Sequence, residues 1–282
     1  MPELELSAGT IDYEDTGGGG PAVVLLHGLL MDSSQWRHVV ASLRAGYRCM
    51  APTLPIGGHR RPMRPDADLS LRGQVRLVAE FLERLDLDEV TLVGIDTGGG
   101  FAQMLAADRP ERVARMVLIS SEAFDNYPPG LPGHAVWLAA QLPGGVNLAL
   151  QPLRLRPLRR LPVAFGWMSK RPVPDEVMDS WLAPALTHRK IRRDLRKYAR
   201  GARRDRRHML AASERMASFN RPVLVVWAPE DRIFPVEHGR RLAGLLPQGR
   251  LVEIADSYTL ITEDQPAVLN AHLREFLANA AP

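Results

Sequence analysis

Short apolar runs alternate with helical periodicity along most of this chain. Mostly apolar runs lie at residues 22–26, 47–51, 90–93 and 113–119, which is the pattern of parallel strands covered on both faces. Between two of these runs, apolar residues recur at helical spacing at Leu71, Val75, Val78, Leu82 and Leu85. Strands that alternate with helices form βαβ units, so the pattern predicts an α/β fold with a mostly parallel sheet flanked by helices.

The alternation breaks off in the middle of the chain. From about residue 125 to residue 218, prolines separate short apolar and arginine-rich pieces, and no buried strand is evident. The pattern then resumes with an apolar run at 222–227, a helix around 236–246 and a strand at 251–254. We therefore expect an α/β core of residues 1–124 and 219–282 and an inserted helical cap of residues 125–218. The cap would lie over the carboxyl ends of the strands, where open α/β sheets bind ligands.

Composition narrows the class of protein. The chain has 282 residues, of which 45% are hydrophobic, which is enough for one large core with an insertion. Its single cysteine, Cys49, cannot form an internal disulfide and is typical of a buried strand residue. No apolar run approaches the roughly 18 residues of a membrane helix, and the first residues lack the features of a signal peptide. We expect a cytoplasmic protein without a membrane span.

Positive charge is concentrated in the middle of the chain. The net charge is +4, but residues 154–207 contain 17 Lys or Arg and only 5 Asp or Glu. Such a segment can steer an anionic substrate, or bind an acidic partner or a membrane surface. It can also be a solvated helix face whose arginine stems cover apolar surface. No motif beyond charge indicates nucleic-acid binding. We expect a small-molecule substrate, and the sequence leaves the oligomeric state open.

The motif Gly94-x-Asp96-x-Gly98 carries the clearest chemical signal. It follows an apolar strand and precedes a helix, and it matches the Gly-x-nucleophile-x-Gly turn that usually holds a serine. An aspartate in this position suits attack on a saturated carbon that bears a leaving group or an epoxide oxygen, with formation of an alkyl ester. The alternative is that Asp96 only caps the helix, because Asp is a favoured N-cap residue.

Four landmarks in order resemble the α/β-hydrolase fold. They are His27-Gly28, Gly94-x-Asp96-x-Gly98, Trp227-Ala228-Pro229-Glu230-Asp231 and Glu263-Asp264-Gln265-Pro266. Within this superfamily the chain is most similar to the epoxide hydrolases and haloalkane dehalogenases, which use an aspartate nucleophile under a helical cap. The resemblance implies that Asp96 is the nucleophile, that Asp231 orients a histidine, and that the amides of Leu29 and Thr97 form the oxyanion hole. It implies no cofactor and no metal.

The chain departs from this family at the position of the base. The family's histidine precedes the last landmark, where this chain has Thr259 or Tyr258. A hydroxyl is too weak a base to replace imidazole, and a phenol titrates near 10. The alternative for Asp231 is that it only begins a turn and orients no histidine. Among the histidines of the chain, His59 and His134 lie in predicted loops and are the possible relocated bases.

The halide-binding residues of the dehalogenases are also replaced. Their Asn or Trp after His-Gly, and their Trp after the nucleophile, correspond here to Leu29 and Thr97. This disfavours dehalogenation and leaves an epoxide-hydrolase-like reaction, in which Tyr127 or Tyr198 donates to the epoxide oxygen. The alternatives are a lyase or cyclase in which Asp96 only moves a proton, and a catalytically silent fold that binds a ligand under the cap.

Overall fold

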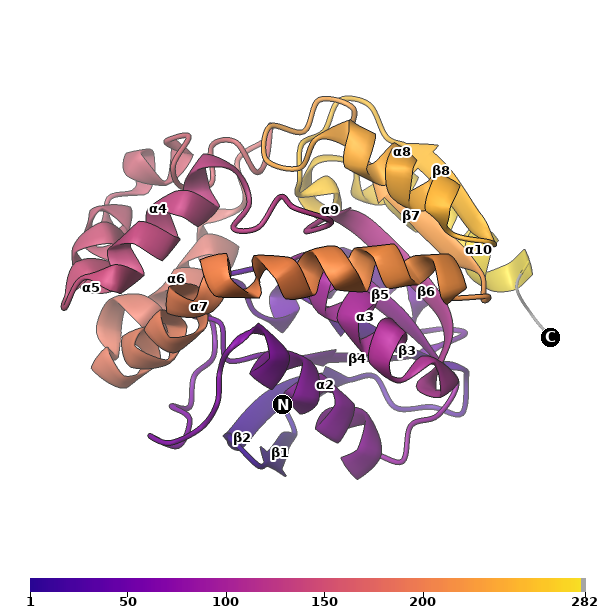
Figure 1. Ribbon diagram of the computed structural model, residues 1–282, viewed down its shortest axis with the longest axis horizontal. Coiled ribbons are helices and arrows are strands. Elements are labelled where there is room, and N and C mark those ends of the chain that lie inside the picture. Colours follow the sequence, from indigo (N-terminus) through magenta and orange to yellow (C-terminus); the bar gives the residue numbers. More distant parts are fainter. Residues whose placement is uncertain (280–282) are drawn as a thin grey trace.

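The computed structural model describes residues 1–279 and contains an eight-stranded sheet in the order β1-β2-β4-β3-β5-β6-β7-β8 (Figure 1). The strands are β1 Glu3–Leu6, β2 Gly9–Asp15, β3 Ala22–Leu26, β4 Arg48–Pro52, β5 Val90–Asp96, β6 Val113–Ser121, β7 Val223–Trp227 and β8 Gly249–Glu253. The β1–β2 and β2–β4 pairs are antiparallel, and all other pairs are parallel. This mostly parallel sheet confirms the fold class that the apolar runs predict.

The register of the central strands determines which loops meet at the carboxyl edge. Leu26, the last residue of β3, pairs with Gly94 of β5, so the loop after β3 begins beside the end of β5. Asp96 at the end of β5 pairs with Ser121, the last residue of β6. Residues that directly follow β3, β5 and β6 are therefore brought together.

Helices cover the sheet. They are α1 Arg37–Leu43, α2 Leu71–Arg84, α3 Thr97–Asp108, α8 Val236–Leu245, the short α9 Ile261–Asp264 and α10 Pro266–Asn279. Helix α3 packs on β5 and β6, α2 packs on α3, and α1 packs on α10. Two 3-10 turns, η1 Ser33–Trp36 and η2 Pro110–Arg112, precede α1 and β6. The buried faces of these helices meet strands that are apolar on both sides, which is the packing expected of βαβ units.

The chain between β6 and β7 is helical and contains no strand. It forms α4 Gly130–Gln141, α5 Gly145–Leu150, the 3-10 helices η3 Gln151–Arg154 and η4 Arg156–Arg160, α6 Asp175–Thr187, α7 Arg189–Arg215 and the 3-10 turn η5 Met216–Ser218. Helices α4, α5 and α6 lie together at one end of the molecule, and α7 runs from them across α3 (Figure 1). Because α7 packs on both α4 and α3, it belongs to both layers, and the division into core and cap stays a prediction.

Arginines of α7 bind backbone carbonyls of neighbouring segments. Arg192 donates to the carbonyls of Ala185 and Leu186 in the last turn of α6, and Arg196 donates to the carbonyl of Ala140 in the last turn of α4. The last carbonyls of a helix have no partner within it, and a cation there also matches the helix dipole. Part of the basic charge therefore stabilises the packing of these helices. This role differs from both interpretations of the sequence, which were attraction of an acidic ligand or surface and a solvated helix face.

Reversal of Arg196 should destabilise the fold. We expect Arg196→Glu to lower the free energy of unfolding by about 1–3 kcal/mol, because it removes a charge-assisted bond to Ala140 and places a carboxylate beside carbonyl oxygens. Lys190→Glu on the same helix makes the same charge change at an exposed position and should have little effect. Urea-induced unfolding measures both. Equal effects of the two variants would contradict the capping role.

Candidate active site

Asp96 occupies a strained turn between β5 and α3. Its φ of 51° and ψ of −126° are sterically unfavourable for a residue with a side chain. Two glycines make the turn possible: a Cβ atom at Gly94 would lie 2.4 Å from the Gly98 carbonyl oxygen, and one at Gly98 would lie 2.1 Å from the Leu26 carbonyl oxygen. The Asp96 side chain makes no capping bond to α3, so the helix-cap alternative is wrong.

Backbone amides lie around the Asp96 carboxyl group. The Leu29 amide donates to Oδ2 at 2.9 Å, and the amide of the next residue, Thr97, lies near enough to lower the pKa of the group. A Cβ atom at Gly28 would lie 2.5 Å from the same Oδ2, so only glycine fits there. Burial raises the pKa of Asp96 to about 7; the two amides lower it, and the charge of Asp231 raises it further. Asp96 is therefore divided between carboxylate and acid near neutral pH.

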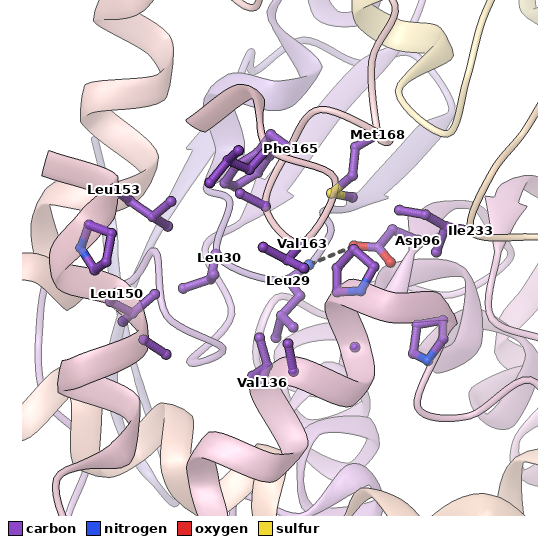
Figure 2. A pocket seen from close by; sticks show the side chains of 18 of the residues that line it. Leu29, Leu30, Asp96, Val136, Leu150, Leu153, Val163, Phe165, Met168 and Ile233 are labelled. Atoms are coloured by element: carbon purple, nitrogen blue, oxygen red, sulfur yellow. Dashed lines mark hydrogen bonds between the residues drawn. The ribbon is translucent and has the colours of Figure 1, made fainter. Parts of the chain in front are cut away.

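Asp96 and Thr97 face a cavity of about 360 Å³ between the sheet and the helical insertion. Figure 2 shows the Asp96 carboxyl group among Leu29, Val163, Met168 and Ile233. The other lining residues are apolar and come mainly from α4, α5, η3 and η4: Leu30, Pro129, Pro132, Gly133, Ala135, Val136, Ala149, Leu150, Pro152, Leu153, Leu158, Leu161, Ala164 and Phe165. Within residues 1–279 no Lys or Arg lines the cavity, so the described walls carry no cation to steer an anionic substrate.

Asp231 lies after β7 and is bonded to Thr259. Its Oδ1 accepts from the amides of Ile233 and Phe234 and from the Thr259 hydroxyl, at 2.8, 3.0 and 2.9 Å. Its Oδ2 has no partner among the described residues. Burial raises the pKa of Asp231 to about 6, against the effect of these hydrogen bonds. Thr259 thus touches the carboxylate at the place where the family resemblance expects a histidine, whereas Tyr258 faces Lys170 and Arg232.

None of the eight histidines lines the cavity. His59 is buried, accepts from the Gly57 amide at Nδ1 and lies 3.4 Å from Asp194 of α7 at Nε2. Burial lowers its pKa. His134 is bonded through Nδ1 to the Gly130 carbonyl, one turn earlier on α4, and faces an outer groove. Both imidazole rings contact groups away from the cavity, so the geometry does not support either histidine as a relocated base.

Glu122 is a buried acid that the sequence analysis does not single out. It directly follows β6, and its Oε1 accepts from the Thr97 hydroxyl at 3.0 Å, while Oε2 has no partner among the described residues. Burial, and then the charge of Asp96, raise the pKa of Glu122 well above its ordinary value. Its position in the sequence was the one signal that could have identified Glu122, because a carboxylate directly after the strand beside β5 lies near Asp96.

Tyr127 and Tyr198 meet beside Glu122. Their hydroxyls are 3.0 Å apart, and both side chains are buried. Together with Glu122 they line a small cavity that shares Leu29 and Val136 with the main one. The two tyrosines proposed as proton donors therefore line a small side pocket next to the main cavity and, like Glu122, are not among the residues that line the main cavity.

Replacing Asp96 should stabilise the protein at alkaline pH. Its folded-state pKa of about 7 exceeds its ordinary value of 3.8, so its stabilising contribution is complete below pH 3.8 and is lost as pH rises through 7. Three pKa units correspond to about 4 kcal/mol. We expect Asp96→Asn to raise the free energy of unfolding by about 2–4 kcal/mol at pH 8 and to change it little at pH 4. Denaturant titrations at both pH values measure this, and an equal effect at both would contradict it.

Two further features of the described residues bear on the chemistry. No cluster of His, Cys, Asp or Glu within residues 1–279 has the arrangement of a metal site. Within the same residues, no helix combines the length and the apolar character that crossing a bilayer requires.

The chain is similar in sequence and in fold to known proteins. The alpha/beta hydrolase fold family matches residues 21–266. An uncharacterized hydrolase of Bacillus subtilis, YugF, is 26% identical over 270 residues, which cover 92% of this chain and 90% of that protein. Haloalkane dehalogenase 2 of Mycobacterium bovis is 28% identical over 283 residues, covering 96% and 93%. A solved structure of a haloalkane dehalogenase DbeA variant from Bradyrhizobium elkanii superimposes with a TM-score of 0.82 at 19% identity, covering 99% and 96%, and shows similarity of fold alone.

Proposed function

The chain belongs to the alpha/beta hydrolase fold family, and we propose that it is a hydrolase that acts on a small, mostly apolar molecule with Asp96 as covalent nucleophile. One observation carries this proposal. Among residues 1–279, the Asp96 carboxyl group is the only ionisable group that faces the cavity, whose other lining residues apart from Thr97 are apolar, and a strained turn and the Leu29 amide fix its direction. Such a fixed nucleophile needs little reorganisation to attack a bound molecule.

An epoxide is the electrophile that the surroundings favour. In the first step an Asp96 oxygen forms a bond to an epoxide carbon, the carbon–oxygen bond of the ring breaks, and the released oxygen takes a proton. Glu122, whose pKa burial raises, lies beside Thr97, and the Tyr127 and Tyr198 hydroxyls lie in the adjoining pocket; these are the groups that can supply the proton. A halide would need N–H donors instead, and no lining side chain carries one.

The second step is hydrolysis of the ester, which needs a base. The Thr259 hydroxyl that contacts Asp231 cannot accept a proton from water near neutral pH, whereas imidazole does. The site therefore supports ester formation better than ester breakdown. An epoxide-hydrolase-like first step with an atypical second step is the function that this geometry favours.

Proton transfer without an ester is the second candidate, and the pKa of Asp96 favours it. A carboxyl group with a pKa of about 7 can both accept and donate a proton near neutral pH, as a lyase or cyclase requires. A protein of this fold that binds a ligand without catalysing a reaction would also have an apolar cavity. Neither alternative requires the carboxyl oxygen to form a bond to carbon.

Incubation with a panel of small apolar epoxides and alkyl halides distinguishes these functions. The proposed function predicts that intact-protein mass spectrometry shows the addition of one substrate molecule, and that peptide mapping places it on Asp96. Reversible binding of the same compounds without any adduct would favour proton transfer or simple binding instead.

A further inference from the structure

Solvent-exposed leucines are concentrated on one part of the helical insertion. Among the described residues, seven of the nine exposed large hydrophobic side chains fall within residues 131–163. They are Leu131, Leu138, Leu142, Leu148, Leu155, Leu161 and Val163, and we call them the leucine face. Leu148 is 77% exposed, Leu155 62% and Leu142 60%, so these side chains have almost no packing role within the fold. Exposed apolar groups gathered in this way indicate an interaction surface.

The leucine face is the outer side of the elements that line the active-site cavity. Leu131 and Leu138 are seven residues apart on α4, which places them on one stripe of that helix, and Leu142 directly follows its last residue. Helix α4 contacts α5, α5 contacts η3, and η3 contacts η4, so the exposed side chains lie on neighbouring elements. Leu161 and Val163 belong both to the exposed set and to the cavity lining. The cavity therefore reaches the surface beside the leucine face.

Basic side chains border this face. Residues 126–174 contain four Arg at 154–160, Lys170 and Arg171, and no Asp or Glu. Acidic residues outside this range pair with four of the six: Asp175 and Asp179 with Arg156 and Arg159, and Asp256 with Lys170 and Arg171. Exposed Arg154 and Arg160 donate to uncharged acceptors, which are the Gln151 side chain and backbone carbonyls, so their charge is not cancelled. Beside α4, the Arg203 guanidinium stacks 3.9 Å from the ring of Trp137, and Arg200 is exposed.

This combination of leucines and cations favours a lipid surface over a second copy of the chain. Two leucine faces packed around a two-fold axis would bring the unpaired Arg154 and Arg160 of both copies to one interface, and the neighbouring acids Asp175 and Asp179 are already paired with Arg156 and Arg159. An anionic bilayer instead attracts the cations and accepts separate leucines into its outer apolar layer without a matching groove.

We propose that the leucine face docks on the surface of an anionic phospholipid bilayer, with the mouth of the cavity turned toward the lipid. Docking of this kind is peripheral and reversible, because only side chains enter the bilayer. It also provides a route for an apolar molecule that partitions into the membrane, since Leu161 and Val163 join the face to the cavity.

Flotation with lipid vesicles tests the proposal on the full-length protein. We expect binding to vesicles of equal parts phosphatidylglycerol and phosphatidylcholine, and roughly tenfold weaker binding to phosphatidylcholine alone or in about 0.5 M salt. A variant with Leu142→Ser, Leu148→Ser and Leu155→Ser should lose most of the binding, and Arg200→Gln should weaken it only on the anionic vesicles. Val268→Ser, at an exposed apolar position on α10, is the matched control and should bind normally.

Three outcomes would overturn the proposal. They are an absence of vesicle binding, binding that is unchanged by the triple leucine substitution, and a stable dimer in solution that the same substitution dissociates. Unchanged thermal unfolding of the triple variant verifies that the exposed substitutions leave the fold intact. Asp96→Asn should float like the unmodified protein, so failure of the proposed catalytic function would leave this test unaffected.

Discussion

Asp96→Asn should abolish the covalent adduct, lowering its rate of formation by at least about 10³-fold, the scale seen when a catalytic nucleophile is removed. The amide is nearly the same size as the carboxyl group and can still accept from the Leu29 amide, so the cavity keeps its shape. Binding of the same compounds should therefore persist. An adduct of equal yield in Asp96→Asn, mapped to another side chain, would contradict the assignment of the nucleophile.

Thr259→His should speed hydrolysis of the ester on Asp96, so that the enzyme can complete its reaction cycle. The Thr259 hydroxyl lies 2.9 Å from Asp231, so an imidazole at this position can donate to the carboxylate and accept a proton from water with its other nitrogen. We expect the ester to decay at least tenfold faster than in the unmodified protein, as measured by loss of the added mass. Thr259→Val is the matched control, since it removes the hydroxyl without supplying a base.

The buried position of Thr259 calls for a second version of this experiment. Histidine is larger than threonine, and Thr259 is fully buried, so the substitution can disturb packing. Thr259→Gly with added imidazole supplies the same base without a covalent link. Rapid turnover by the unmodified protein would show that another base acts, and Glu122→Gln then tests the nearest buried carboxyl group. Stable adducts in both rescue experiments would exclude this position as the site of the base.

The core of the fold follows from the sequence because burial on both faces leaves a strong local signal. The expected strand at 22–26 is β3, and the expected strands at 47–51 and 251–254 lie within one or two residues of β4 and β8. The Gly94-x-Asp96-x-Gly98 motif was equally informative, because close backbone contacts at both glycines leave no space for a Cβ atom.

The helical insertion was harder to predict, for physical reasons. Helix α7 is a single helix of 27 residues, but its stability comes from arginines that bind carbonyls of other segments as well as from an apolar stripe. Such contacts depend on the tertiary structure and leave no periodic signal. Glu122 was missed for a similar reason: one carboxylate after a strand matches no motif, and its importance comes from the register that places β6 beside β5.

The rate of adduct formation should rise steeply with pH. Only the carboxylate form of Asp96 attacks, and burial raises its pKa to about 7, so the rate should increase roughly tenfold per pH unit below 7 and level off above about pH 8. At pH 5 it should be about 100-fold below the plateau. Single-turnover kinetics with one epoxide between pH 5 and 9 measure this profile. A flat profile would mean that Asp96 is ionised throughout and that burial does not control its charge.

Asp231→Asn should move this profile to lower pH, because the negative charge of Asp231 is one of the causes that raise the pKa of Asp96. The expected shift is less than about one unit, since burial is the larger cause. The asparagine can still accept from the Ile233 and Phe234 amides, so the loop after β7 should keep its form. Glu111→Gln removes an equal charge at the opposite, amino-terminal edge of the sheet and should leave the midpoint unchanged. A midpoint that moves equally in both variants would reflect the net charge of the protein alone. A shift confined to Asp231→Asn would show that the charge of Asp231, beside Thr259, controls the ionisation of Asp96.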